Sequence, residues 1–290
     1  MLKKNDPLVA PLEIINALHT LYKEGRENDL SLRLIKLRNI YPNSPEIHNI
    51  MGAIAVKKNC ESEAISNFRK AIDLDNKNPD YYNNLGAALT NMSEYTKAEK
   101  ILTKAIELDP NYAKAFNNLG NIFSKSKKRY KEAIVAYNKA IKINPNYYEA
   151  YNNLGNILGK IGEIRSAELA LQKAKKINPS FDEITQNLII LYRSFNKLKK
   201  AYSLLDKHIK NNPSAEAKFL EIKSDLLSEF GNFKEALHIL KKIYKNEPGN
   251  YNVISKILSL SFIDNEKDAL DLHRKYCEVI ESKKIPPDTN

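Results

Sequence analysis

A short pattern returns along this chain at intervals of 34 or 35 residues. The segments 81–89, 115–123 and 150–158 read YYNNLGAAL, AFNNLGNIF and AYNNLGNIL. Each is followed by a second amphipathic segment and then by AIELDPNY, AIKINPNY or AKKINPSF. This order indicates two amphipathic helices and a turn in every repeat. With 42% hydrophobic residues, 28% charged residues and no Trp, the core must be thin and widely distributed, so we predict an all-α protein, an α-solenoid.

The same frame extends in both directions from the clearest repeats. It predicts an array over residues 11–250 with repeats at 11–44, 45–78, 79–112, 113–147, 148–181, 182–215 and 216–250. A degenerate repeat or capping helices follow at 251–285. The extra residue of the fourth repeat falls in SKSKKRY, a basic loop between helices where an insertion costs little. No linker or second domain is expected within the array.

Small and large residues recur where neighbouring helices must approach each other. Glycine stands at position 8 of the first helix and alanine at position 20, in the second helix, while large residues fill the space between helices. The glycines are Gly52, Gly86, Gly120 and Gly155, and the large residues are Phe68, Leu102, Tyr137 and Leu171. Prolines such as Pro110, Pro145 and Pro179 follow the second helices, which cannot continue through them.

Leu-Gly at positions 7 and 8, Ala at 20 and 27, and Pro at 32 resemble the tetratricopeptide repeat pattern. The resemblance covers roughly residues 11–250 and is most specific between 79 and 181. The consensus Trp at position 4 is replaced here by His48, Tyr82, Phe116 and Tyr151. The resemblance implies a right-handed superhelix whose first helices line the inner surface, with partner binding as the usual role.

Positions 2, 6, 9 and 13 of each first helix form one stripe opposite the apolar stripe. We expect this stripe to face a concave, asparagine-lined groove. Asparagine occupies position 6 in five of the eight repeats, at Asn16, Asn84, Asn118, Asn153 and Asn187. Duplication of one ancestral repeat would also produce such a row. The candidate binding residues are Asn84, Asn118, Asn121, Lys125, Asn153, Asn156, Lys160 and Asn187.

An asparagine side chain offers one acceptor and two donors, so it can pair with the backbone of an extended peptide. Helices about 8–10 Å apart would meet such a peptide at roughly every third residue. A double change of Asn118 and Asn153 to Ala is expected to leave folding nearly intact, because both side chains are expected to be exposed. A clamp for a C-terminal carboxylate would need Lys at position 5, where Asn83, Asn117 and Asn152 stand.

The asparagine row resembles the groove of the O-linked N-acetylglucosamine transferases and their SPINDLY-like relatives, at Asn84, Asn118, Asn153 and Asn187. The segment DALDLHRKYCEVIE is similar to the connector of the SPINDLY-like enzymes, around His273, Arg274 and Tyr276. A helical cap would explain this segment without any enzyme. The resemblance implies, as an alternative function, the substrate-recognition part of such a glycosyltransferase without its catalytic domain.

The sequence contains no catalytic, metal or cofactor motif. A phosphate-binding glycine loop, HExxH and GxSxG are all missing, and Cys60 and Cys277 lie far apart with no metal-ligand spacing. We therefore predict a non-enzymatic protein with no cofactor and no metal, whose partner is another protein or an extended peptide segment. The sequence leaves the oligomeric state open.

The net charge of +11 would suit an acidic partner or nucleic acid, but lysines on solvated helix faces explain it equally. RNA-reading repeats of similar length lack the Gly, Ala and Pro pattern, so nucleic acid is not expected. No stretch is apolar for long enough to insert in a membrane, and we expect a cytoplasmic protein.

Overall fold

The computed structural model describes residues 8–247 and 250–263. These residues form fifteen α-helices, two short 3-10 helices and no strand, which confirms the all-α prediction. Within the same ranges, no helix combines the length and the apolar character needed to cross a membrane. The α-helices are α1 Leu12–Lys23, α2 Glu27–Ile40, α3 Pro45–Lys57, α4 Glu61–Leu74, α5 Pro79–Asn91, α6 Tyr95–Leu108, α7 Ala113–Phe123, α8 Tyr130–Ile143, α9 Tyr148–Lys160, α10 Ile164–Ile177, α11 Asp182–Ser194, α12 Leu198–Asn211, α13 Glu216–Glu229, α14 Phe233–Asn246 and α15 Tyr251–Ile263.

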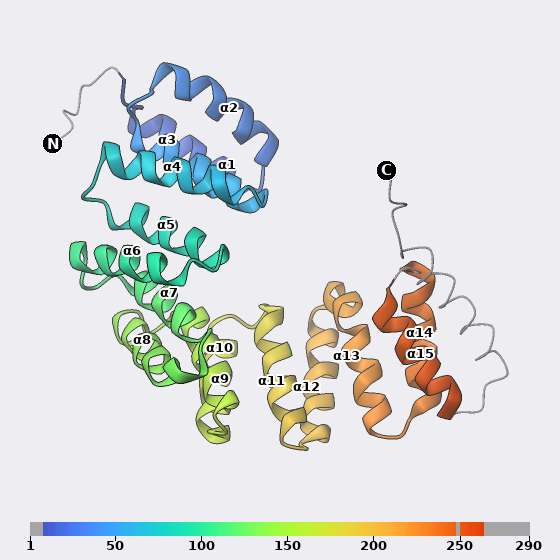
Figure 1. Cartoon of the computed structure of the whole chain (residues 1–290). Coiled ribbons are helices and arrows are strands. Elements are labelled where there is room, and N and C mark those ends of the chain that lie inside the picture. The colour runs from blue at the N-terminus through green and yellow to red at the C-terminus, as the bar shows by residue number, and fades with distance from the viewer. Residues whose placement is uncertain (1–7, 248–249, 264–290) are drawn as a thin grey trace, which may run out of the picture. The chain divides into compact units, whose positions relative to one another are not determined.

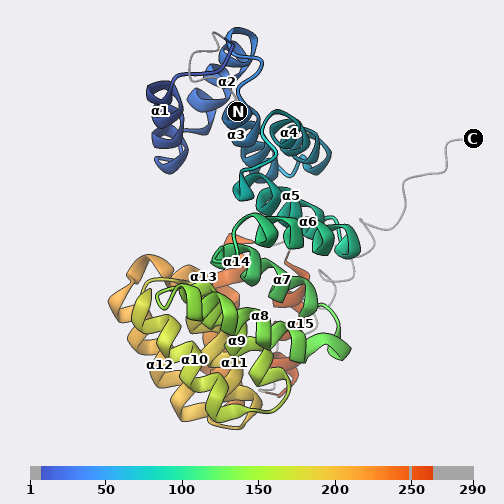
Figure 2. The same cartoon turned by 90° about the vertical axis from the view of Figure 1, so that its left-hand side faces the viewer.

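The chain divides into two compact units, residues 1–177 and 178–290. In the first unit α3 packs on α4, α5 on α6, α7 on α8 and α9 on α10, and the second helix of each pair packs on the first helix of the next (Figure 1). Figure 2 shows the same succession from α3 to α6 from another side. In the second unit α11 packs on α12, and α13 on α14, which also contacts α15.

In six of the pairs, the turn between the two helices contains a residue in the left-handed backbone conformation. It is Gly25, Asn59, Ser93, Gly162, Asn196 or Gly231, with φ between 54° and 84°. At Asn59 the chain makes the paired hydrogen bonds of a Schellman turn, from Asn59 N to Val56 O and from Cys60 N to Ala55 O. The pair α7 and α8 differs, because the 3-10 helix Lys127–Arg129 stands between them, within SKSKKRY.

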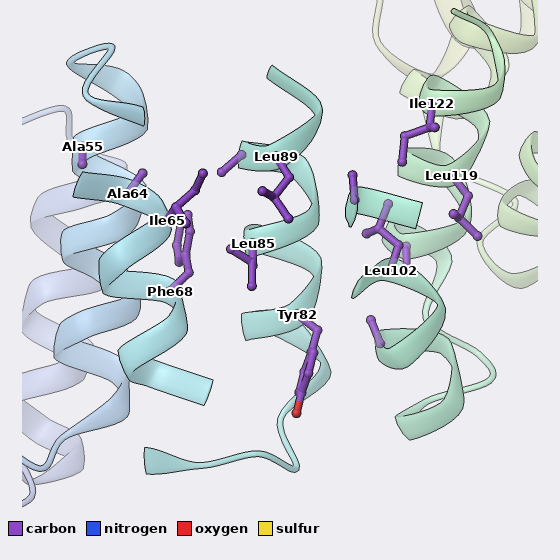
Figure 3. Packing of buried hydrophobic residues seen from close by; sticks show 14 of the residues in the cluster. Ala55, Ala64, Ile65, Phe68, Tyr82, Leu85, Leu89, Leu102, Leu119 and Ile122 are labelled. Carbon is purple, nitrogen blue, oxygen red and sulfur yellow. The ribbon is translucent and has the colours of Figure 1, made fainter. Parts of the chain in front are cut away.

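The glycines of the first helices lie directly under the large residues of the second helices. A Cβ atom added at Gly86 would be 2.6 Å from Leu102 Cγ, and one added at Gly52 would be 2.6 Å from the Phe68 ring. Phe68 and Leu102 are themselves 2% and 0% exposed. Figure 3 shows Phe68 and Ile65 of α4 directed toward the helix that carries Leu85 and Leu89. The predicted pairing of small and large residues is confirmed.

The C-terminal predictions fall only partly within the described residues. Helix α15 occupies residues 251–263, at the start of the predicted degenerate repeat, and its Val253 and Ile257 are buried against α14. The remainder of 251–285 lies outside the described residues, and so do His273, Arg274, Tyr276 and Cys277.

Candidate functional site

The first helices of the N-terminal pairs share one pocket. It has a volume of about 480 Å3 and is lined by α1, α3, α5 and α7. Its polar lining consists of His19, Glu46, Asn49, Asp80, Asn84 and Lys114. Tyr22, Ile50 and Ala53 supply the rest of the wall. The size is within the range of known ligand sites, about 300–1,000 Å3.

An amide ladder connects the first helices of successive repeats. Asn84 Nδ2 donates to Asn49 Oδ1 at 2.8 Å, and Asn118 Nδ2 donates to Asn83 Oδ1 at 2.8 Å. Asn153 Nδ2 donates twice, to Asn117 Oδ1 at 3.1 Å and to Asn121 Oδ1 at 3.0 Å. The position-6 asparagine of one repeat therefore binds the position-5 asparagine of the repeat before it.

This ladder corrects the expectation that Asn118 and Asn153 are simply exposed. Both are half-buried, and the acceptors Asn83 and Asn117 are only 5% and 6% exposed. Removing the only donor to a buried amide oxygen lowers the free energy of unfolding, because water cannot replace that donor. The half-burial has a geometric reason: the two side chains reach across to the neighbouring first helix instead of pointing straight out.

The other predicted groove residues have different environments. Asn121 is a structural acceptor, since the Tyr137 hydroxyl also donates to its Oδ1 at 2.9 Å. Asn156 is half-buried, and Lys125 and Lys160 are exposed; within the described ranges none of these three side chains has a hydrogen-bond or ion-pair partner. Asn187 is half-buried on α11, in the second unit.

Two carboxylates of the pocket are held by tyrosine hydroxyls, one from the following repeat and one from the end of the same repeat. The Tyr81 hydroxyl donates to Glu46 Oε1 at 2.7 Å, and the Tyr112 hydroxyl donates to Asp80 Oδ1. Burial, and then the hydrogen bond to the carboxylate, raises the pKa of Tyr81 and of Tyr112 well above the usual range of tyrosine. Both hydroxyls therefore stay protonated and keep orienting the carboxylates even in alkaline solution, where an ordinary tyrosine begins to ionise.

In the second unit, ion pairs occupy the corresponding helices. Lys256 Nζ of α15 lies 2.7 Å from both Glu221 Oε1 and Asp225 Oδ1 of α13, and Arg193 of α11 pairs with Glu229. Several of these residues line a second cavity of about 360 Å3. Because its charges are paired with each other, this cavity offers fewer free groups to a ligand than the pocket of the first unit does.

One buried cluster has the residue types of a catalytic triad. His208 Nε2 lies 3.0 Å from Asp182 Oδ1, and its Nδ1 lies 3.3 Å from Thr185 Oγ1. However, Thr185 is 0% exposed and His208 is 3% exposed, so a substrate cannot reach the hydroxyl. The cluster connects α11 to α12 and is structural. Across the described ranges, no group of three His, Cys, Asp or Glu residues is placed to hold a metal ion.

The ladder makes a testable prediction about stability. Asn118→Ala is expected to lower the free energy of unfolding by about 1–3 kcal/mol, because it leaves the buried Asn83 Oδ1 without its donor. Asn156→Ala removes the same side chain from a site with no hydrogen bond and is expected to stay within about 0.5 kcal/mol of wild type. Urea unfolding of the two variants compares them directly, and equal stabilities would argue against the ladder.

Sequence reasoning missed the pocket at α1, α3, α5 and α7. The predicted groove residues run from Asn84 to Asn187 and include only Asn84 of this pocket, whereas Glu46 and Asn49 belong to a repeat without the NNLG motif. The signal was nevertheless present, since Glu46, Asp80 and Lys114 all occupy position 2 of their first helices.

Sequence models of the tetratricopeptide repeat match this chain in several places. One described as TPR repeat matches residues 61–93 and 124–162. Three described as tetratricopeptide repeat match residues 79–112, 101–135 and 148–181. These matches place tetratricopeptide repeats within residues 61–181, and such repeats typically bind other proteins or peptides. No curated protein matches the chain.

Solved structures support the same fold. PilF of Pseudomonas aeruginosa is 21% identical, with a TM-score of 0.57, and the match covers 69% of this chain and 90% of that one. A chain of the APC/C hetero-tetramer Cut9-Hcn1 is 14% identical, with a TM-score of 0.64, and the match covers 92% of this chain and 53% of that one. At these identities the likeness concerns the fold alone.

Proposed function

We propose, on the premise that residues 61–181 are built of tetratricopeptide repeats, that this protein is a non-catalytic scaffold that binds an extended segment of another protein. The binding surface is the row of polar side chains on the first helices α3, α5, α7 and α9. The amide ladder is the observation that carries this proposal, because it holds those side chains at regular intervals along successive repeats. A cytoplasmic location is part of the same proposal.

The ladder leaves part of each amide for a ligand. Asn153 uses both of its N–H groups within the ladder, so only its Oδ1 remains, as an acceptor for a ligand N–H. Asn118 uses one N–H group and keeps the other together with its Oδ1. Asn156 keeps its whole amide. These groups match the N–H and C=O groups of an extended backbone, which every peptide sequence has in common.

The proposed site therefore combines ladder residues with free ones. Asn84, Asn118, Asn121 and Asn153 shape the groove through their hydrogen bonds to other repeats. Asn156, Lys125 and Lys160 lack such bonds and would contact the ligand directly. The likeness to glycosyltransferase repeat regions, and a role for Asn187 of the second unit, stay predictions from the sequence.

Selection from random peptides tests the proposal, because it requires no particular partner. We expect the full chain to select binders from a phage-displayed library of random 12-residue peptides. The double variant Asn156→Ala with Lys160→Gln is expected to bind the selected peptides about tenfold more weakly, because it removes direct ligand contacts but no ladder bond. Fluorescence anisotropy with labelled peptides measures the loss.

A matched variant controls for the change of residue type. Asn111→Ala with Lys142→Gln alters two exposed residues outside the first helices and is expected to bind like wild type. If the library yields no binder, or if both double variants bind the selected peptides equally well, the groove is not the binding surface.

A further inference from the structure

The position-2 side chains of the first unit carry a pattern of charges. Along α3, α5, α7 and α9 they are Glu46, Asp80, Lys114 and Glu149, that is, negative, negative, positive and negative. None of these four forms an ion pair with any residue in the part of the chain that the structure describes. Elsewhere ion pairs are common, for example between Lys57 and Glu27, and between Arg129 and Glu99.

The first three of these charges line one cavity. Glu46, Asp80 and Lys114 all lie on the wall of the pocket of about 480 Å3 between α1, α3, α5 and α7. Each of the two carboxylates is oriented through one oxygen by a tyrosine hydroxyl, and its second oxygen remains available to a ligand. Ile50 and Ala53 on the same wall can contact the aliphatic part of a long side chain.

The pocket complements a ligand that carries both signs of charge. A guanidinium or an ammonium group would bind the carboxylates in a charge-assisted way, while a carboxylate of the ligand would bind Lys114. The net charge of the whole chain, +11, attracts acidic ligands in general. The two carboxylates of the pocket, Glu46 and Asp80, instead favour a basic residue of the ligand at that position.

We propose that this pocket receives a Lys or Arg side chain of the bound polypeptide between Glu46 and Asp80, and that an acidic residue near it in the same segment pairs with Lys114. Neighbouring first helices are about 8–10 Å apart, and the midpoint between α3 and α5 is one and a half such spacings from α7, about 12–15 Å. Because an extended chain rises about 3.3 Å per residue, the two ligand residues are about four positions apart. This inference rests on the proposed function, because it assigns side chains to the extended segment that lies along the groove.

The random 12-residue phage library also tests this inference. Selection with the wild-type chain is expected to enrich peptides in which a basic and an acidic residue stand about four positions apart. The double variant Glu46→Gln with Asp80→Asn should bind these peptides at least about tenfold more weakly, since it removes two charges that face the ligand. Lys114→Gln should weaken binding only for the peptides that contain the acidic residue.

Two further measurements make the comparison specific. Glu63→Gln with Asp73→Asn changes the net charge by the same amount on the exposed face of α4 and is expected to leave binding unchanged. Circular dichroism and thermal unfolding of each variant establish that it is folded. Raising the salt concentration should weaken the binding of the enriched peptides more than the binding of uncharged peptides. The ion pairs between the enriched peptides and the pocket are partly exposed, so salt screens them.

The outcomes separate this inference from the proposed function. If the selected peptides need Asn156 and Lys160 for binding but are not enriched in basic residues, the proposed Lys or Arg pocket is wrong. The groove then remains the proposed binding surface. Enriched peptides that bind equally to wild type and to the variant with Glu46 and Asp80 neutralised also overturn it. A library that yields no binder counts against both.

Discussion

Replacement of Phe68 by Ala is expected to lower the free energy of unfolding by about 3–5 kcal/mol. The ring is 2% exposed and belongs to the buried cluster that contains Ile65 of α4 and Leu85 and Leu89 of α5 (Figure 3). It also covers Gly52 of α3, so one side chain connects three helices. Removing it leaves a cavity that these helices cannot easily fill, because their backbones are held by the neighbouring repeats.

Urea unfolding followed by circular dichroism measures this loss. Leu169→Ala is the control, because this side chain is 67% exposed and its removal should change stability by less than about 0.5 kcal/mol. Stability in a repeat array is a sum over repeats and their interfaces, so the Phe68 variant should unfold first around α3, α4 and α5. A loss below about 1 kcal/mol would mean that the core is not packed as described.

Replacement of Gly86 by Val is expected to cost about 3 kcal/mol or more. The first atom of the new side chain would lie 2.6 Å from Leu102 Cγ, well inside van der Waals contact, and Leu102 is fully buried. Either α5 must move away from α6 or the Leu102 side chain must leave its rotamer. In both cases buried contacts of the core are lost.

The neighbouring position provides a matched control for this substitution. Ala87→Val places the same residue in the same helix on a partly exposed site, so it should cost less than about 1 kcal/mol. The double variant Gly86→Val with Leu102→Ala should be more stable than the sum of the two single effects, because the smaller partner makes room. Additive losses in this cycle would show that the two residues do not contact each other.

The fold was predictable because its signals are local and repeated. The glycine at position 8 and the large residue about 16 positions later identify two helices that pack closely. In the structure, Gly86 and Leu102 are in such close contact. The proline turns show where each second helix ends. These features involve residues that are close together in the sequence, so they can be recognised in a single sequence.

The site was predictable only in part, because its key contacts lie between repeats. The asparagine row was visible in the sequence, but the hydrogen bond from Asn118 to Asn83 joins residues 35 positions apart, and helix periodicity carries no information about it. The doublets Asn83–Asn84, Asn117–Asn118 and Asn152–Asn153 are the available signal, since position 5 supplies an acceptor to position 6 of the next repeat. The ion pairs of Lys256 in the second unit gave no signal beyond charged residues on a helix.

Site-specific photo-crosslinking tests the central claim most directly, which is that the first helices of the first unit bind an extended polypeptide. A photoreactive benzoylphenylalanine replaces either Ala87, on the first helix α5, or the exposed Leu169, on the second helix α10. The full chain is then irradiated with a labelled peptide from the 12-residue library. We predict crosslinked product from position 87 and only background from position 169. Crosslinking from position 169 that equals or exceeds that from position 87 would contradict the account and place the ligand on the second helices.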